Sequence, residues 1–149
     1  MCIRDRLGLE ADCAADSCLS ILEEGSDDGD GLYWLAPDGD LTSARELYCD
    51  MTTDDGGWTR LYASLYPTWW SDSDWGDVGD ADGDDFSALD LREHFADDDG
   101  SWTLRLQVGT VDTWDTSDYD YFTVWTQGHD PIEESSDGSD YTYLSLIHI

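Results

Sequence analysis

The amino-acid sequence predicts an α+β fold, in which a short N-terminal helix is attached to an antiparallel β-meander and the remainder is rich in loops. A short apolar segment with helix-capping residues is followed by apolar segments that turn-forming, glycine-containing stretches separate. Most of the acidic residues are aspartates, often beside glycine, and this pairing favours turns over helices. The length of 149 residues allows one domain or part of one.

The helix is expected over residues 18–24. Asp16 or Ser17 can accept hydrogen bonds from its first backbone amides, and Gly25 is placed to end it. Its leucines and isoleucine supply an apolar side. A helix this short is not stable alone, so we expect it to depend on packing against the strands that follow.

Three strands are expected at residues 31–35, 44–51 and 58–65. The first connection, at residues 37–40, contains a proline that presets φ and a glycine that tolerates a positive φ. The second, at residues 54–57, ends in two glycines. Together these segments predict a meander held to one helix.

The rest of the sequence is less regular. We expect a helix over residues 86–95, a strand over 102–108 and another over 121–125, while residues 141–143 begin a further element. In the 102–108 segment, apolar residues alternate with polar ones, which is the period of a half-buried strand.

The charge of the protein excludes several classes of partner. Asp and Glu number 36 against 6 Lys and Arg, all of them arginine, and the formal net charge is -30. Such a protein repels phosphates, so we expect no nucleic-acid binding and no docking on anionic membranes. No apolar run approaches the roughly 20 residues of a membrane span. The 8 Trp and 8 Tyr argue against disorder. Adaptation to high salt would explain the acidic surface.

The two ends of the sequence are predicted to be foreign. A nucleotide reading of residues 144–149 is the reverse complement of one that encodes residues 1–6, and the string resembles a transposon adapter used to prepare sequencing libraries. We therefore expect both hexapeptides to be adapter-derived and leave them out of fold reasoning. Neither end is then natural, and three of the four cysteines remain. Residues 7–17, which are small and acidic, are predicted to form a linker.

The order of motifs within residues 18–65 resembles the N-terminal part of the fibrinogen C-terminal-like domain. The resemblance rests on a cysteine in a short helix, then Gly31-Leu32-Tyr33-Trp34-Leu35, Tyr48-Cys49-Asp50-Met51 and Gly56-Gly57-Trp58. From position 66 the sequence looks more like short microbial relatives. The resemblance implies that residues 18–143 are a partial domain whose C-terminal part is missing. The calcium loop and ligand pocket of the family lie in that part, so no binding residue is carried over.

The resemblance implies a disulfide between Cys18 and Cys49, which would tie the helix to the sheet. Closing a loop of about 30 residues would contribute roughly 3–4 kcal/mol. The residues alone leave two reduced, buried thiols as an alternative. Cys13 is then left over, and we expect it to pair with a missing segment or with another chain. A zinc site would need a second cysteine pair.

The acidic run at residues 80–85 is the candidate cation site. Asp80, Asp82 and Asp84 place carboxylates at alternate positions, as loops that bind hard cations do, and calcium is the cofactor this favours. The run departs from the EF-hand pattern, because Asp85 stands where glycine is required and Leu91 where an acid is required. A solvated acidic loop is the alternative.

Aromatic residues and histidines offer the remaining candidates. Trp69 and Trp70 lie in a polar segment and could stack on a sugar ring, although tryptophans of such domains are more often part of the core. His94 is expected on a helix surface, and His129 is expected as a structural loop residue. No spacing marks a catalytic nucleophile, so we expect no enzyme.

The resemblance implies an extracellular or cell-surface recognition module. Members of the family bind carbohydrates, acetylated groups or proteins, frequently with calcium, so a glycan or protein ligand is expected here. A secreted enzyme that acts on polysaccharide and a purely structural surface module are the alternatives.

Overall fold

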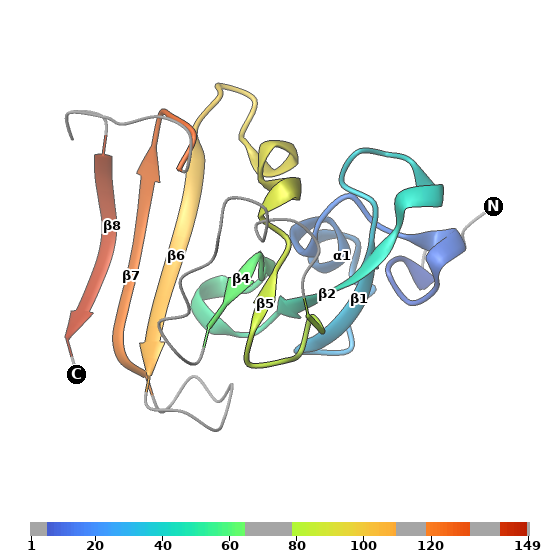
Figure 1. Cartoon of the computed structure of the whole chain (residues 1–149), viewed down its shortest axis with the longest axis horizontal. Coiled ribbons are helices and arrows are strands. Elements are labelled where there is room, and N and C mark those ends of the chain that lie inside the picture. The colour runs from blue at the N-terminus through green and yellow to red at the C-terminus, as the bar shows by residue number, and fades with distance from the viewer. Residues whose placement is uncertain (1–5, 65–78, 110–118, 132–140, 149) are drawn as a thin grey trace. The chain divides into compact units, whose positions relative to one another are not determined.

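The computed structural model describes residues 6–64, 79–109, 119–131 and 141–148 (Figure 1). The protein divides into two compact units, residues 1–94 and residues 95–149. The first unit contains two antiparallel sheets and the second unit contains one, which agrees with the predicted α+β class. None of the helices in the described residues is both long and apolar enough to cross a membrane.

The first unit begins its regular structure with helix α1, Cys18–Glu24, which matches the predicted bounds. Its start is a capping box: the Ser20 amide donates to Ser17 Oγ at 3.1 Å, and the Ser17 amide donates to Ser20 Oγ at 3.2 Å. Gly25 ends the helix in the left-handed region at φ 69°. The predicted cap and stop residues are therefore confirmed.

The predicted meander is the sheet β1-β2-β3. Strand β1 is Gly31–Leu35, β2 is Arg45–Asp50 and β3 is Trp58–Thr59, and each neighbouring pair is antiparallel. A 3₁₀ helix, Leu41–Ser43, lies in the β1–β2 connection.

The third predicted strand, 58–65, is divided between two sheets. After β3, the backbone forms a second short strand, β4, Tyr62–Ala63, which pairs with β5, Phe86–Ser87. The change of partner occurs because the Arg60 amide still donates to Tyr48 of β2, whereas the carbonyl of Leu61 accepts from Ala88.

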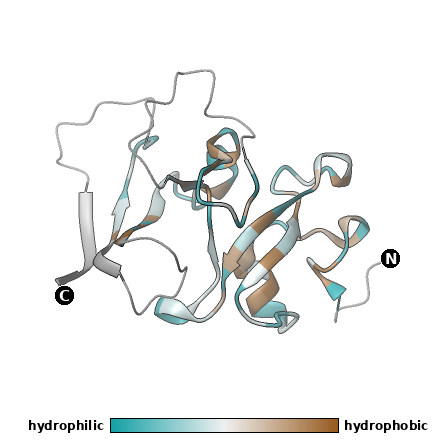
Figure 2. Cartoon of the chain, turned by 60° about the horizontal axis from the view of Figure 1, so that its bottom comes forward, coloured by the Kyte–Doolittle hydropathy of each residue, from teal (hydrophilic) through white to brown (hydrophobic). Residues whose placement is uncertain are grey.

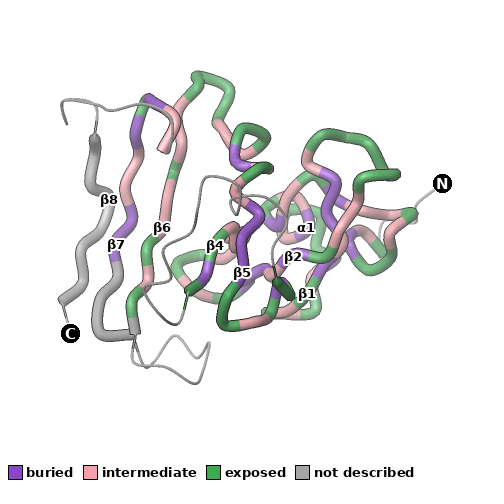
Figure 3. The backbone as a smooth tube through the Cα atoms, in the orientation of Figure 1, coloured by how far each residue is buried: buried purple, intermediate pink, exposed green. Residues whose placement is uncertain are grey.

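The disulfide between Cys18 and Cys49 joins the first turn of α1 to β2, as the family resemblance implied. The two Cα atoms are 5.5 Å apart and neither cysteine is exposed to solvent. Apolar residues concentrate in α1 and this sheet (Figure 2), and their buried positions appear in purple in Figure 3. Ile21, Leu35 and Leu47 are fully buried and form the core around the disulfide. The bridge therefore fixes a helix that is too short to be stable alone.

Residues 7–17 are part of the first unit and do not form the predicted linker. The segment contains a 3₁₀ helix, Ala11–Cys13. The amide of Trp34 donates to Gly8 at 2.7 Å and the amide of Ala15 donates to Trp34 at 3.0 Å, so the segment bonds to the outer edge of β1. Backbone hydrogen bonds hold it in place, and these are independent of the small, acidic side chains on which the linker prediction was based.

The turn before β3 has an unusual backbone. Asp54 and Asp55, in the 3₁₀ segment Thr53–Asp55, have φ of 52° and 69°, and Gly56 has φ 75° and ψ -171°. That last conformation is essentially restricted to glycine. A Cβ atom at Gly56 would also lie 2.1 Å from the carbonyl oxygen of Met51. The glycine is therefore required by both conformation and space.

The helix predicted over 86–95 is only partly correct. Its first two residues form β5, and a 3₁₀ helix follows at Leu89–Phe95. The spacing of the apolar residues is compatible with an α-helix or a 3₁₀ helix. The start of the segment forms a strand instead, because Phe86 pairs with Ala63 of β4.

The second unit contains the sheet β6-β7-β8. Strand β6 is Trp102–Gly109, β7 is Tyr119–Gln127 and β8 is Tyr141–His148, all antiparallel. The strands predicted at 102–108 and 121–125 are confirmed and are slightly longer. Strand β8 includes residues 144–148, whose adapter origin stays a prediction.

Candidate functional site

The first unit contains a shallow groove. Its volume is about 230 Å³. Strands β1 and β2 contribute one side, and the loop that precedes β5 contributes the other. The lining residues are Leu32, Arg45, Glu46, Gly79, Asp80, Ala81, Asp82 and Phe86.

Arg60 fixes the backbone of the loop at residues 79–85. Its guanidinium donates to the carbonyl oxygen of Ala81 at 3.2 Å and to that of Gly83. The same group lies over the ring of Phe86, 5.8 Å from the ring centre. Within the loop, the Gly83 amide donates to the Asp80 carbonyl at 2.8 Å. The loop is therefore held mainly through its backbone carbonyls, and no hydrogen bond to the carboxylates of Asp80 or Asp82 takes part in holding it.

The three candidate calcium ligands, Asp80, Asp82 and Asp84, lie on this loop, where Asp80 and Asp82 line the groove and Asp84 does not. Within the part of the protein that the structure describes, no three Asp, Glu, His or Cys residues come together as a metal site. Arg60 also binds the carbonyl oxygens of Ala81 and Gly83, and backbone carbonyls are among the ligands that hard cations take. Calcium binding by this loop stays a prediction.

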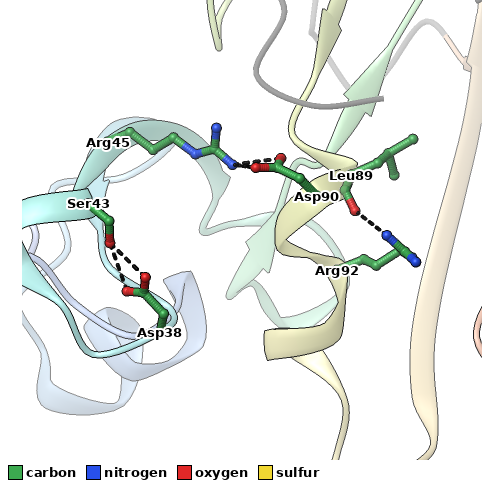
Figure 4. Close-up of polar contacts among 6 residues, drawn as sticks. All are labelled: Asp38, Ser43, Arg45, Leu89, Asp90 and Arg92. Atoms are coloured by element: carbon green, nitrogen blue, oxygen red, sulfur yellow. Dashed lines mark hydrogen bonds and ion pairs between the residues drawn. The ribbon is translucent and has the colours of Figure 1, made fainter. Parts of the chain in front are cut away.

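Among the residues that line the groove, Arg45 carries the one basic side chain, and this side chain is paired with the carboxylate of Asp90. Its guanidinium donates to both carboxylate oxygens of Asp90, at 2.7 and 2.9 Å (Figure 4). Both hydrogen bonds come from one nitrogen, Nη2, and they hold the guanidinium beside Asp90. The remaining polar side chains of the groove, Glu46, Asp80 and Asp82, are acidic. The groove thus presents hydrogen-bond acceptors beside the apolar side chain of Leu32, which is 39% exposed.

The turn between β1 and β2 is held by a carboxylate. Asp38 accepts from the amide of Asp40 at 2.9 Å and from the hydroxyl of Ser43 at 2.8 and 2.9 Å (Figure 4). These two donors, the amide first, hold the pKa of Asp38 below its ordinary value.

The other candidate residues either do not line the groove or lie outside the described residues. Trp69 and Trp70 lie outside the described residues. His94 is exposed on the 3₁₀ helix, as expected. His129 is buried in the second unit, where its carbonyl accepts from Gln127 Nε2 at 3.0 Å, which agrees with a structural role. Cys13 is disulfide-bonded, and the identity of its partner stays a prediction.

Sequence reasoning did not identify Arg45 and Arg60 as site residues. Their partners are 45 positions away in the sequence for Arg45, and 21 and 23 positions away for Arg60, so no local motif contains them. The feature of the sequence that could have identified these two residues is the small number of basic side chains. In a protein with 6 bases against 36 acids, each arginine is a strong candidate for a structural or binding role.

Comparison with known proteins identifies the family. The sequence profile for the C-terminal globular domain of the fibrinogen beta and gamma chains matches residues 14–130. Mouse tenascin is 61% identical over 28 residues, which are 19% of this protein and 1% of tenascin, so the protein spans a very small part of that relative. Domains of this kind are generally extracellular binding modules without enzymatic activity. The protein belongs to the family of C-terminal globular domains of the fibrinogen beta and gamma chains.

Proposed function

We propose that this protein acts outside the cell as a recognition domain for a glycan or protein ligand, and that the groove beside the 79–85 loop contacts that ligand. The observation that carries the proposal is the groove itself, which combines exposed carboxylates with an apolar side chain. An extracellular location is supported by the buried disulfide between Cys18 and Cys49, because disulfides persist in oxidising compartments.

The size and chemistry of the groove favour a small part of a larger ligand. Its volume of about 230 Å³ lies below the range of about 300–1,000 Å³ that is usual for pockets that enclose a small molecule. One sugar ring or one side chain is the matching size. The carboxylates of Asp80 and Asp82 accept no hydrogen bond from the described residues, so they are available to sugar hydroxyls or to a basic side chain.

A glycan array screened with the whole protein tests the proposal, followed by titration of any ligand found. Asp82→Asn should weaken binding by about tenfold, because a hydrogen bond to a charged group contributes about 1.5–3 kcal/mol. Asp98→Asn is the matched control, since it makes the same charge change at an exposed residue that does not line the groove. Equal effects of the two substitutions would contradict a role for the groove. Assays for turnover of each ligand would reveal the alternative of a polysaccharide-acting enzyme.

Calcium dependence is a finer part of the proposal, with Asp80, Asp82 and Asp84 as the candidate ligands. Calorimetric titration with calcium alone tests it, with Asp84→Asn as the variant that should lose binding. An unchanged melting temperature and no heat of binding at millimolar calcium would remove calcium from the proposal. Ligand binding that persists in a chelator would leave the groove as the recognition element without the metal.

A further inference from the structure

The sequence contains seven places where aspartate is followed directly by glycine. They begin at Asp28, Asp30, Asp38, Asp55, Asp82, Asp99 and Asp137, and only the last lies outside the described residues. At such a step the glycine amide nitrogen can attack the side-chain carboxyl carbon of the aspartate and close a five-membered succinimide. Glycine permits this because no side chain blocks the approach. The folded structure decides which steps are free to react.

Four of the described steps are restrained at the attacking nitrogen. In each, the glycine amide already donates to the backbone carbonyl three residues earlier, at distances of 2.8–3.0 Å. The pairs are Gly39 with Ala36, Gly56 with Thr53, Gly83 with Asp80 and Gly100 with Asp97. The attack requires that hydrogen bond to break first, which slows each of these steps.

Three steps are restrained at the carboxyl group. One Asp30 oxygen accepts from the Met51 amide at 2.7 Å and the other from the Thr52 hydroxyl at 2.9 Å. Asp38 and Asp99 likewise accept from a backbone amide and a serine hydroxyl. These hydrogen bonds hold each carboxyl group in place, so they must break before it can turn toward the glycine nitrogen.

The step from Asp28 to Gly29 has neither restraint. Within the described residues, the Asp28 carboxylate accepts no hydrogen bond and the Gly29 amide donates none. Apart from Gly29 and its two chain neighbours, no heavy atom of the described residues lies within 4 Å of the position that a Cβ at Gly29 would take. The hydroxyl of Tyr33 accepts from the Asp28 amide and donates to the Gly29 carbonyl, both at 2.8 Å. Tyr33 therefore holds the flanking backbone without occupying either reacting atom.

We propose that Asp28–Gly29 is the preferred site of isoaspartate formation in the folded protein, and so a modification site for isoaspartyl methyltransferases. The Gly29 nitrogen bonds to the Asp28 side-chain carbon, the carbon–oxygen bond of the neutral carboxyl breaks, and the hydroxyl leaves with the amide proton as water. One water then adds to either ring carbonyl carbon, the bond from that carbon to the glycine nitrogen breaks, and the nitrogen takes up a proton. Cleavage at the backbone carbonyl leaves the glycine attached through the side-chain carbon, which is isoaspartate. The sequence of steps needs no oxidant or reductant.

The product would alter the connection between α1 and β1. An isoaspartyl link adds one carbon to the backbone between the two atoms that Tyr33 bridges. The tyrosine hydroxyl cannot keep both hydrogen bonds over the longer path, so the Asp28 amide should lose its acceptor. Hydrogen exchange at that amide reports the change independently of mass mapping.

Incubation of the folded whole protein at neutral pH, followed by peptide mapping with isoaspartate-specific fragmentation, tests the proposal. Rates are taken relative to those of the reduced, denatured protein, where every step is equally free. Asp28 should exceed each other described step by at least about fivefold, which is the factor that about 1 kcal/mol for one broken hydrogen bond gives. The proposal fails if another described step leads, or if the folded and denatured proteins share one pattern.

Methyl transfer by an isoaspartyl methyltransferase provides a second readout. Asp28→Glu should lower methyl incorporation, because glutamate would have to close a less favourable six-membered ring. Asp38→Glu is the matched control at a restrained step and should leave incorporation unchanged. Equal losses in the two variants, or no loss in Asp28→Glu, would overturn the assignment.

Discussion

Loss of the disulfide between Cys18 and Cys49 should destabilise the first unit by roughly 3–4 kcal/mol. The cysteines are 31 positions apart, and the loop-entropy relation for a loop of that length gives about 3.7 kcal/mol at 25 °C. Both side chains are fully buried, so replacement by alanine adds a packing cost to this figure. The helix is short enough that its attachment to β2 should fail when the bridge is absent.

The assay is urea unfolding monitored by hydrogen exchange at the Trp34 and Ala36 amides, which bond across β1 to the preceding segment. Substitution is preferred to chemical reduction because Cys13 is disulfide-bonded too. Cys18→Ala and Cys49→Ala each remove the bridge, so either single variant should lose most of the stability lost by the double variant. Additive single effects would show that the two thiols act independently and would refute the reasoning.

Three further predictions follow from the backbone, the turns and the charge. Gly56→Ala should lower the free energy of unfolding in urea by more than about 4 kcal/mol, because the new Cβ would lie 2.1 Å from a backbone carbonyl oxygen. Gly25→Ala should lower it by only about 1–2 kcal/mol, because no atom crowds the new Cβ there and only the left-handed backbone is strained. Equal costs would contradict this. The Asp40 amide, and after it the Ser43 hydroxyl, lower the pKa of Asp38. The stability that the ionised Asp38 side chain contributes is therefore present above its pKa in the unfolded protein and lost as the pH falls through its pKa in the folded protein. An NMR titration of Ser43→Ala should show that pKa moving back up. Molar sodium chloride should raise the melting temperature, because screening weakens repulsion in a protein of net charge -30, and a lower melting temperature would reject adaptation to high salt.

The elements that the sequence predicted best are those with local signals. The bounds of α1 follow from a serine cap, a short apolar run and Gly25, all within a few residues. The β1–β2 connection follows from the proline and Gly39, whose φ is 76°. The alternation in residues 102–108 predicted β6 because the period of a strand is visible in one segment. The disulfide needed more than local signals, and the family resemblance supplied it.

The features that the sequence did not predict depend on contacts between distant segments. Residues 7–17 bond to β1 through backbone groups, which every sequence possesses. The division of 58–65 between two sheets depends on the carbonyl of Leu61 accepting from Ala88, far away in the sequence. The groove depends on Arg60, whose contact with the loop carbonyls has no sequence motif. The side-chain pattern therefore predicted the individual elements, whereas these contacts between distant segments are seen only in the structure.

The surplus of aspartate has two different uses in this protein. Carboxylates such as Asp38, Asp40 and Asp99 accept from hydroxyls and amides two to five residues later, and these bonds lower their pKa values and close turns. Their acidity thus serves local structure and needs no external partner. Asp80 and Asp82 differ, because Arg60 holds their loop through its carbonyls and leaves both carboxylates without a donor from the described residues. The total charge therefore says little about binding, whereas these two exposed carboxylates of the groove can accept hydrogen bonds from a ligand.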